Sequence, residues 1–335
     1  MTFLDEHLVA IRAARSRVGP HVLHTPALPA DHVLPGLVLK PELLQPTGSF
    51  KVRGAFNAVL SLREREPGIG GVIAVSSGNH GQAVALAARA TGLRCVVVMP
   101  EESNPVKMAG VRALGAEVVS QGVTGANREQ RVRELQEQTG LALIHPFDSW
   151  DVIHGQGTAG LELAEDVAEL GTVICPVGGG GLISGCALVL RGLGTAVRLV
   201  GVEPELAGDA AASRRSGRRE RLAEPPKTIA DGLRSMSLGE RSFEVIVERG
   251  LVDEIVTVSE AEIEAATLAA WTRLHLTAEP SGAVGLAALL SGRVAPDPAG
   301  SRIAIVLTGG NVDPALMVRL FSGGAAREPG GGSSP

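Results

Sequence analysis

The chain has 335 residues, a formal net charge of −5 and 43 glycines. This length indicates two domains with a sizeable core, and the sequence has no long basic run that would indicate nucleic-acid binding. No apolar run reaches the length of a membrane span and the N-terminal stretch lacks a signal-peptide pattern, so we expect a cytoplasmic protein without membrane contact.

The first seventy residues are predicted to contain a helix, a short strand and a second helix. Apolar residues recur at helical spacing over 5–18, and the apolar run 37–40 is typical of a short strand. A loop with proline, glycine and hydroxyl residues then leads into a helix predicted over 51–63, and Pro-Gly-Ile-Gly-Gly at 67–71 marks a boundary. Lys51 therefore lies at a junction between loop and helix.

This junction affects the amine of Lys51. The first backbone amides of a helix are unpaired and the helix dipole is positive there, which disfavours an ammonium charge and lowers the pKa of the lysine. A neutral amine can form a Schiff base with an aldehyde. On residue type alone, a surface lysine on the first helical turn is the simpler interpretation, so the rest of the chain has to decide.

Residues 72–144 alternate between strand and helix patterns. Continuous apolar strands that alternate with helices predict a parallel sheet covered on both faces, here in a small α/β domain. The predicted strands are 72–75, 95–99, 117–119 and 141–144, and the predicted helices are 80–90, 105–115 and 125–138.

A second set of helices and strands follows, up to residue 324. Glycine, proline and charge predict loops and short helices over 205–240, and the composition of 325–335 predicts a disordered tail. The predicted helices are 156–170, 182–193, 260–274, 281–291 and 312–321, and the predicted strands are 173–175, 197–202 and 303–307.

Four consecutive glycines occupy 178–181, between a predicted strand and a predicted helix. They let consecutive backbone amides converge on an anion, and the helix N-terminus adds its dipole. The run matches neither the dinucleotide-binding fingerprint nor the P-loop, since no lysine follows. A close helix–strand crossing is the alternative, but it usually needs one or two glycines, so we interpret the run as a phosphate cup.

Residues 76–82 (Ser-Ser-Gly-Asn-His-Gly-Gln) also lie between strand and helix. Their amides and short polar side chains suit a carboxylate at a helix N-terminus. An ordinary N-cap by Ser77 or Asn79 is the alternative. So many consecutive polar or glycine residues exceed what capping needs, which favours a binding site.

Residues 307–312 (Leu-Thr-Gly-Gly-Asn-Val) form a third strand–glycine–helix junction. Thr308 ends a buried strand at its carboxyl edge, where open α/β sheets bind ligands. Three such junctions and a lysine favour one ligand with a phosphate, a carbonyl and a ring. Pyridoxal phosphate fits all three parts.

Two further groups of residues carry candidate chemistry. Glu203 and Asp209, with a carbonyl between them, can gather oxygens around a hard divalent cation, although a solvated acidic loop is the simpler interpretation. Cys95, Cys175 and Cys186 have neither metal nor disulfide spacing. Cys95 and Cys175 lie in apolar strand-like runs, so we interpret them as core residues in a reducing compartment.

Taken in order, these motifs resemble the serine/threonine dehydratases, including serine racemase, among the fold-type II pyridoxal-phosphate enzymes. The likeness runs from about Thr25 to Asp313. Each motif alone is weak to moderate, whereas eight in order are highly specific. The matching segments are 49–55 (Ser-Phe-Lys-Val-Arg-Gly-Ala), 76–83, 155–158 (Gly-Gln-Gly-Thr), 178–181, 201–204 (Gly-Val-Glu-Pro), 228–232 (Thr-Ile-Ala-Asp-Gly), 279–280 (Glu-Pro) and 308–313.

The resemblance implies an α/β fold with two parallel-sheet domains and pyridoxal phosphate in the cleft between them. The small domain, 71–144, would be inserted in the large one, formed by 1–70 and 145–324. A divalent cation (Mg, Mn or Ca) and a homodimer are also implied. The implied partner is a small β-hydroxyamino acid.

The resemblance also implies roles for single residues. Lys51 would be the Schiff-base lysine, and Ser77 would be the acid/base on the opposite face. The implied cofactor contacts are Phe50 and Lys51, Asn79 at the ring hydroxyl, Thr308 at the pyridine nitrogen, and Gly178, Gly179, Gly180 and Gly181 at the phosphate. The implied substrate contacts are Ser76, Ser77, Asn79, His80, Arg128 and Ser235, and the implied cation ligands are Glu203, the Ala207 carbonyl and Asp209. Thr308 replaces the serine of many relatives, so the tilt of the ring can differ.

The expected reaction is the removal of water from L-threonine or L-serine by an ammonia-lyase, which gives a 2-oxo acid and ammonia. Lys51 is the expected base for the α-proton, with the cofactor as electron sink. Serine racemase and threo-3-hydroxyaspartate dehydratase are alternatives, because dehydratases carry the Ser77 motif as well. A non-catalytic ligand-binding α/β protein is the alternative from another class, and Lys51 argues against it.

Overall fold

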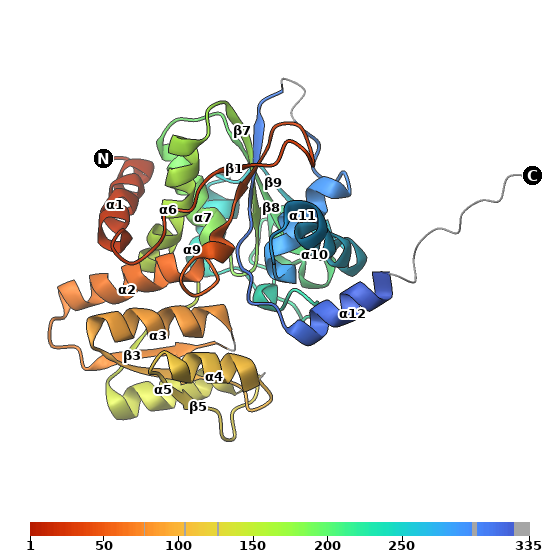
Figure 1. The fold of residues 1–335 in the computed structure, drawn as a ribbon. Coiled ribbons are helices and arrows are strands. Elements are labelled where there is room, and N and C mark those ends of the chain that lie inside the picture. Colours follow the sequence, from red (N-terminus) through yellow and green to blue (C-terminus); the bar gives the residue numbers. More distant parts are fainter. Residues whose placement is uncertain (77, 104, 126, 297–299, 325–335) are drawn as a thin grey trace, which may run out of the picture.

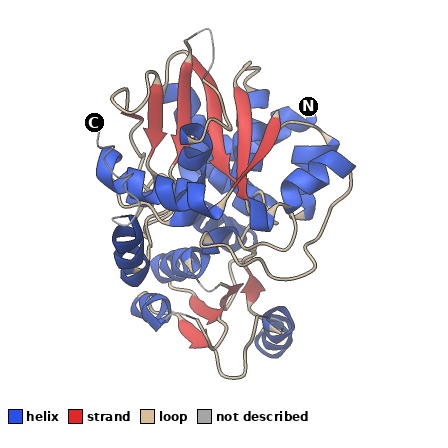
Figure 2. Ribbon diagram, turned by 90° about the vertical axis from the view of Figure 1, so that its right-hand side faces the viewer, coloured by secondary structure: helices blue, strands red, loops and turns tan. Residues whose placement is uncertain are grey.

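The computed structural model describes residues 1–335 apart from 77, 104, 126, 297–299 and 325–335, and these form two sheets (Figure 1, Figure 2). The strands are β1 (Leu28–Pro29), β2 (Leu37–Lys40), β3 (Gly71–Val75), β4 (Arg94–Val98), β5 (Glu117–Val119), β6 (Ala142–Leu143), β7 (Leu170–Pro176), β8 (Arg198–Pro204), β9 (Glu254–Val258) and β10 (Arg302–Val306). The larger sheet has the order β1-β2-β10-β7-β8-β9 and is parallel except for its β1–β2 pair. The smaller sheet, β5-β4-β3-β6, is parallel throughout. The predicted α/β fold with two parallel sheets is confirmed.

The helices follow the strands in alternation. They are α1 (Phe3–Val18), α2 (Lys51–Arg65), α3 (Asn79–Thr91), α4 (Pro105–Ala113), α5 (Arg128–Thr139), α6 (Trp150–Asp166), α7 (Gly181–Gly192), α8 (Asp209–Ser216), α9 (Glu240–Phe243), α10 (Glu260–Leu274), α11 (Pro280–Leu290) and α12 (Pro314–Gly324). Short turns of helix are η1 (Glu42–Leu44), η2 (Glu205–Ala207), η3 (Asp231–Leu233) and the π-helical η4 (Glu244–Glu248). The strands of the smaller sheet all lie within 71–144, and the division of the chain into domains at those residues stays a prediction.

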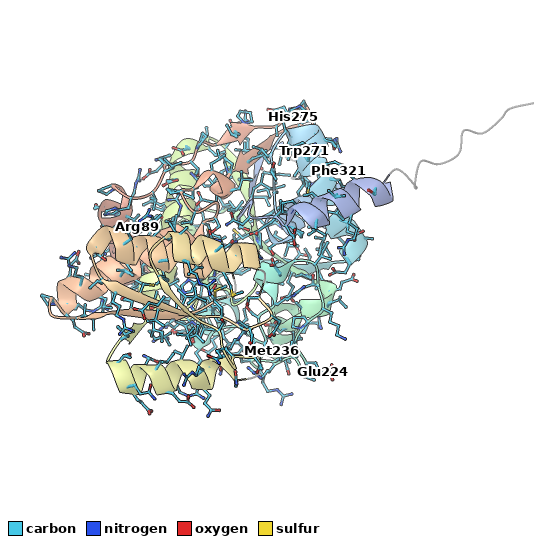
Figure 3. All side chains as sticks on the ribbon, turned by 60° about the horizontal axis from the view of Figure 1, so that its bottom comes forward. Arg89, Glu224, Met236, Trp271, His275 and Phe321 are labelled. Atoms are coloured by element: carbon cyan, nitrogen blue, oxygen red, sulfur yellow. The ribbon has the colours of Figure 1, made fainter. Side chains whose placement is uncertain are left out.

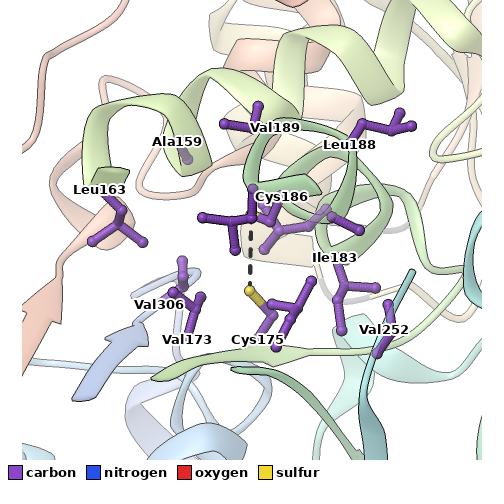
Figure 4. Close-up of a cluster of buried hydrophobic side chains, with 14 of the residues drawn as sticks. Ala159, Leu163, Val173, Cys175, Ile183, Cys186, Leu188, Val189, Val252 and Val306 are labelled. Carbon is purple, nitrogen blue, oxygen red and sulfur yellow. Dashed lines mark hydrogen bonds between the residues drawn. The ribbon is translucent and has the colours of Figure 1, made fainter. Parts of the chain in front are cut away.

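Helices cover both faces of the larger sheet, which explains its continuous apolar strands. Along β7, Val173 and Cys175 belong to the core cluster with α6 and α7, whereas Ile174 belongs to the cluster with α11. The thiols of Cys175 and Cys186 lie 3.9 Å apart in the first cluster (Figure 4). All three cysteines are buried free thiols, so the interpretation of Cys95 and Cys175 as core residues is confirmed.

The helix that begins at Lys51 lies between the helices of the two sheets. α2 packs against α6 on one side and against α3 on the other (Figure 1). Its residues Val52 and Phe56 share a core cluster with Val72 and Ala74 of β3. The start of α2 is therefore fixed by elements of both sheets.

Helix α6 and strand β9 are among the elements that differ from the sequence prediction. Helix α6 begins at Trp150 rather than at residue 156, because tertiary packing overrides the low helix propensity of Gly155. A side-chain carbon at Gly155 would lie 2.5 Å from the carbonyl oxygen of Arg53, so glycine permits a close helix crossing there. Strand β9 was missed because four of its five residues are only partly buried, which leaves no continuous apolar run.

The surface carries an exposed aromatic pair. Trp271 on α10 and Phe321 on α12 pack edge to face with their ring centroids 6.0 Å apart (Figure 3). This contact joins α12 to α10. In the described part of the chain, no helix combines the length and apolar character that a membrane crossing requires.

Candidate active site

Backbone contacts join the lysine loop to the loop after β10. Ser49 and Gly309 form an isolated antiparallel bridge. The Phe50 amide donates a hydrogen bond to the Thr308 carbonyl at 3.0 Å. The structure thus brings together the segments of Lys51 and Thr308, at the carboxyl end of the parallel strand β10, where such sheets bind ligands.

The Lys51 amine is largely removed from water. Its Nζ donates a hydrogen bond to the Pro146 carbonyl at 2.9 Å and lies 5.1 Å from the centroid of the Phe50 ring. Burial lowers the pKa of Lys51 to about 8, against the opposing influence of the Glu279 carboxylate. An amine with this pKa is neutral in an appreciable fraction of molecules near physiological pH, so it can serve as nucleophile or base.

Asn79 links the smaller sheet to the loops around Lys51. Its Nδ2 donates to Glu279 Oε1 at 2.6 Å, and its Oδ1 accepts from Asn311 Nδ2 at 2.8 Å. Asn311 Nδ2 also donates to the Thr47 carbonyl at 2.8 Å. One chain of hydrogen bonds therefore connects the starts of α3 and α11 with the lysine loop.

Glu279 is a residue to which the sequence reasoning assigned no role. It is 3% exposed, and burial together with the nearby Asp231 carboxylate raises its pKa to about 7, against the hydrogen bond from Asn79. The available signal was an acidic residue directly before Pro280, the first residue of the apolar helix α11. Its carboxyl group can hold or release a proton close to the Lys51 amine.

The glycine loop between β7 and α7 has features of an anion site. Gly180 has φ +87°, a left-handed conformation that favours glycine. A side-chain carbon at Gly179 would lie 2.2 Å from the Phe147 ring. Beside Gly180, the buried Ser242 Oγ has no hydrogen-bond partner among the described residues. A hydroxyl left unpaired at a helix N-terminus fits a ligand with phosphate oxygens, and Ser242 was missed by the sequence reasoning.

The loop before α3 holds its histidine away from solvent. His80 Nε2 hydrogen-bonds the Ile144 carbonyl oxygen at 2.8 Å, and the side chain is buried. Burial and the Lys51 charge lower the pKa of His80 to about 3, so its ring is neutral. Ser76 Oγ accepts a hydrogen bond from the Gly78 amide at 3.1 Å. Binding of a substrate carboxylate by this loop stays a prediction. Because the His80 ring is neutral, the carboxylate would be bound by the backbone amides of the loop rather than by a charged histidine.

Of the three other predicted contacts, the structure places one beside these loops. Ser235 is close to the glycine loop, since a side-chain carbon at Gly178 would lie 3.3 Å from its Oγ. Arg128 is the first residue of α5, and its buried Nε has no hydrogen-bond partner in the described part of the chain. Ser77 lies outside the described residues.

Glu203 and Asp209 form an acidic pair that is joined to α8 rather than to the lysine. The carboxylate oxygens of Glu203 accept from the Ala210 and Ala211 amides at 3.1 and 2.8 Å. Asp209 Oδ2 is buried without a partner among the described residues. Burial, with a contribution from the Asp209 charge, raises the pKa of Glu203 to about 8, and burial raises the pKa of Asp209 to about 7.

The predicted third cation ligand is a backbone group. The described residues contain no cluster of three or more His, Cys, Asp or Glu side chains suited to a metal. Ala207 lies in η2, between Glu203 and Asp209 in sequence, and is buried. A hard cation prefers oxygen ligands, so the Ala207 carbonyl would have to add a third oxygen to those of Glu203 and Asp209.

Comparison with known proteins gives consistent similarities. The sequence profile of the family described as pyridoxal-phosphate dependent enzyme matches residues 18–309. Serine racemase from Oryza sativa subsp. indica is 40% identical over 315 residues, which cover 92% of this chain and 91% of that protein. L-threo-3-hydroxyaspartate ammonia-lyase from Saccharomyces cerevisiae is 40% identical over 314 residues, 92% of this chain and 94% of that protein.

A solved structure shows the same similarity in three dimensions. The crystal structure of a threonine deaminase from T.th. superposes with a TM-score of 0.84 at 47% sequence identity. The match covers 91% of this chain and 98% of that one. Proteins named for three different activities thus resemble this chain over nearly its whole length.

Proposed function

The chain belongs to the pyridoxal-phosphate dependent enzymes, and from this premise we propose that it is an ammonia-lyase that removes water from L-threonine or L-serine. The products would be a 2-oxo acid and ammonia. The observation that carries the proposal is the Lys51 amine, which is largely removed from water and has a pKa of about 8. The nearby glycine loop offers backbone amides to an anionic ligand. The Ser242 hydroxyl beside it, which has no partner among the described residues, is available to the same ligand.

The residues present fit pyridoxal phosphate. When bound, this cofactor supplies an aldehyde for amines and a conjugated ring that withdraws electrons from the substrate. The amides of Gly178 to Gly181 and the Ser242 hydroxyl would hold its phosphate, with Phe50 beside the ring. Asn79 has one amide hydrogen to spare for the ring hydroxyl, since the other is directed at Glu279. Thr308 would face the pyridine nitrogen with an uncharged hydroxyl.

The proton chemistry falls to Lys51. Its neutral Nζ can remove the α-proton of the bound substrate, while the amides of loop 76–80 hold the substrate carboxylate. One base is enough for the loss of water. Racemisation needs a second acid/base on the opposite face, for which the sequence offers Ser77. That alternative is therefore kept for the test.

The substrate side chain is proposed to be uncharged. A side-chain carbon at Gly78 would lie 3.9 Å from the Lys107 amine, so this cation borders the carboxylate loop. Lys107 is already paired with Asp231. A second carboxylate on the substrate would have to compete with Asp231 for that cation. This favours threonine and serine over 3-hydroxyaspartate.

The acidic pair is proposed to bind a divalent cation, Mg, Mn or Ca. Glu203, Asp209 and the Ala207 carbonyl are the proposed ligands. Two buried carboxyl groups with raised pKa values and one unpaired oxygen support this assignment. The homodimer and the cytoplasmic location expected from the resemblance stay predictions, and sedimentation of the purified protein tests the first.

The first prediction tests the lysine. Lys51→Ala should remove the visible absorbance of the lysine-bound cofactor and lower 2-oxo-acid release by at least about 1,000-fold, because a general base and the covalent anchor are lost together. The matched control is Lys227→Ala, which removes an exposed lysine and should leave both signals intact. Full turnover by Lys51→Ala would refute the proposal.

The reaction itself is tested with a substrate panel. Release of 2-oxo acid is measured with L-threonine, L-serine and L-threo-3-hydroxyaspartate, and the remaining serine is analysed for its D-enantiomer. Faster release from the first two substrates supports the proposal. Accumulation of D-serine without 2-oxo acid would assign the chain to the racemase instead.

A further inference from the structure

Four charged side chains are buried together behind the start of α2. Lys40, Glu42 and Arg53 have no exposed surface, and Glu162 is 3% exposed. They come from β2, η1, α2 and α6. Two positive charges balance two negative ones. Such a group is costly to bury unless every charge is paired with good geometry.

The Arg53 guanidinium is paired along both edges of its fork. Nε and Nη2 donate to the Glu42 carboxylate at 2.7 and 2.8 Å, and Nη1 and Nη2 donate to Glu162 at 2.7 and 2.8 Å. Nη1 also donates to Thr158 Oγ1, and Nη2 to the Leu23 carbonyl, both at 3.1 Å. Burial opposes the charge, but the two carboxylates raise the pKa of Arg53. Two bidentate pairs leave this planar group little freedom to rotate.

Lys40 and Thr25 close the network. Lys40 Nζ donates to Glu162 at 2.5 Å and to the Thr25 carbonyl at 2.6 Å. Thr25 Oγ1 donates to Glu42 at 2.6 Å. Segment 23–25, η1 and α6 are thus all held around the Arg53 side chain.

Helix α2 crosses α6 directly beside Arg53. A side-chain carbon at Gly54 would lie 2.4 Å from the Gln156 amide, and one at Gly155 would lie 2.7 Å from the Gly54 Cα. The two helices therefore touch backbone to backbone. Farther along α2, Asn57 Nδ2 donates to the Asp151 carbonyl of α6 at 2.6 Å. At the first turn of α2, the Arg53 guanidinium joins the two helices through Thr158 and Glu162 of α6.

The segment before α6 carries a group that faces the Lys51 amine. Segment 146–147 leads into α6, and the Pro146 carbonyl accepts the hydrogen bond from Lys51 Nζ. Phe147, the next residue, packs on Gly179 of the glycine loop. Lys51 lies two residues before Arg53, so a rotation of the first turn of α2 would move Nζ away from this segment.

We propose that Arg53 is a positioning residue, which fixes the first turn of α2 on α6 and thereby holds the Lys51 amine at the Pro146 carbonyl. The inference rests on the proposed role of Lys51, but it is tested on the amine itself. A role in stability alone would not need these charges, because well-packed apolar side chains often replace a buried ion network without loss. An apolar side chain at position 53 would fill the same space but would not fix the orientation of α2 on α6.

The test uses full-length Arg53→Met, Arg53→Lys and the milder Thr158→Val. In protein freed of cofactor, the pH dependence with which an amine-reactive reagent labels Lys51 is followed by peptide mass spectrometry. We expect the pKa of Lys51 in Arg53→Met to rise from about 8 toward the ordinary lysine value of roughly 10.4, because water reaches the amine. Arg53→Lys should not restore it, since an ammonium cannot form two bidentate pairs.

Enzyme reloaded with cofactor gives the second readout. A displaced Lys51 should lower kcat by about 100-fold while KM changes much less, because the reacting atoms are misplaced and the substrate contacts remain. Thr158→Val removes one hydrogen bond from the guanidinium and should shift both readouts in the same direction by a smaller amount.

The matched control is Arg17→Met. Arg17 donates to Asn57 and Glu64, both farther along α2, at 2.7 to 2.9 Å. Its loss should lower Tm but leave the labelling profile of Lys51 and kcat unchanged. If Arg53→Met does not fold, Arg53→Lys and Thr158→Val decide the question.

A wild-type labelling profile in the folded Arg53 or Thr158 variants would overturn the inference, whether or not kcat falls. The failure of the proposed function looks different. In that case the wild-type enzyme releases no 2-oxo acid from any substrate, and the labelling profiles still decide whether Arg53 positions Lys51.

Discussion

Buried carboxylates occur in two regions of this molecule under opposite electrostatic conditions. Glu42 and Glu162 are at most 3% exposed and lie against Arg53 and Lys40. Burial opposes ionisation of Glu42, but the charge and hydrogen bonds of Arg53 lower its pKa. Glu203 and Asp209 are equally buried, yet burial raises their pKa values to about 8 and about 7.

We call the residues around Glu42 and Glu162 the first region and those around Glu203 and Asp209 the second region. The difference shows which of them has enough positive charge of its own. The first region contains its own cations, Arg53 and Lys40, and keeps Glu42 charged without any ligand. In the second region, two backbone amides are the hydrogen-bond donors to Glu203, and Asp209 Oδ2 has no partner in the described part of the chain. A buried carboxyl group under these conditions prefers the neutral form. A divalent cation would supply to the second region the positive charge that Arg53 and Lys40 supply to the first.

The largest expected effect comes from breaking the first region. Glu42→Gln removes one of the two carboxylates that pair with the buried Arg53 charge. We expect the free energy of unfolding to fall by about 3–5 kcal/mol, as when one partner of a buried ion pair is removed. Denaturant unfolding with an unchanged m-value measures this loss.

The control for this variant is Glu64→Gln, which removes the exposed partner of Arg17. A surface ion pair contributes little, so the loss should be below about 1 kcal/mol. Equal losses in the two variants would show that burial does not distinguish the first region from an ordinary surface pair.

A medium effect is expected from pH in the second region. In protein treated with a chelator, Glu203 and Asp209 bind protons in the folded state that the unfolded chain releases near pH 4. Their contribution to stability is therefore complete below that pH and is lost as the pH rises toward about 8. We expect this loss of stability to appear between pH 5 and pH 8, where both carboxyl groups ionise in the folded protein.

Added Mg, Mn or Ca should reverse this loss, because a cation binds the ionised carboxylates and displaces their protons. The measurement is Tm against pH with and without cation, together with proton release in weakly buffered solution. Parallel curves with no proton release would contradict the proposed cation site.

How much of this could be predicted from the sequence depends on the distance between the partners. Lys51 lies at a junction of loop and helix, and the glycine loop and Thr308 lie at junctions of strand, glycine and helix. Neighbouring residues therefore supply both the functional group and its local geometry. The parallel sheets were likewise predictable from continuous apolar runs. These features were visible without knowledge of the tertiary packing.

The long-range pairs were not predictable in this way. Arg53 and Glu162 are 109 residues apart, and Asn79 and Glu279 are 200 apart. Which side chains pair across such distances depends on how α2 crosses α6 and where α11 begins. The helical pattern of one segment contains neither piece of information. The same reason explains α6 itself, since Gly155 reads as a break in a helix until its packing partner is known.

The smallest expected effect is also the most specific for the second region. Asp209→Asn makes the side chain permanently neutral, which removes the cost of a buried charge at pH 8 but leaves one buried polar atom without a partner among the described residues. The two contributions oppose each other, so in chelator the variant should be more stable than the wild type by only about 1 kcal/mol. Its stabilisation by a divalent cation should disappear.

The matched control for Asp209→Asn is Glu205→Gln, which changes an exposed carboxylate in the same segment, between Glu203 and Asp209 in sequence. This control should keep the full response to the cation. Thermal unfolding of the three proteins at pH 8, with and without cation, separates the outcomes. A cation response that survives in Asp209→Asn would show that the cation binds elsewhere, and the second region would then be a pair of protonated acids rather than an incomplete ion network.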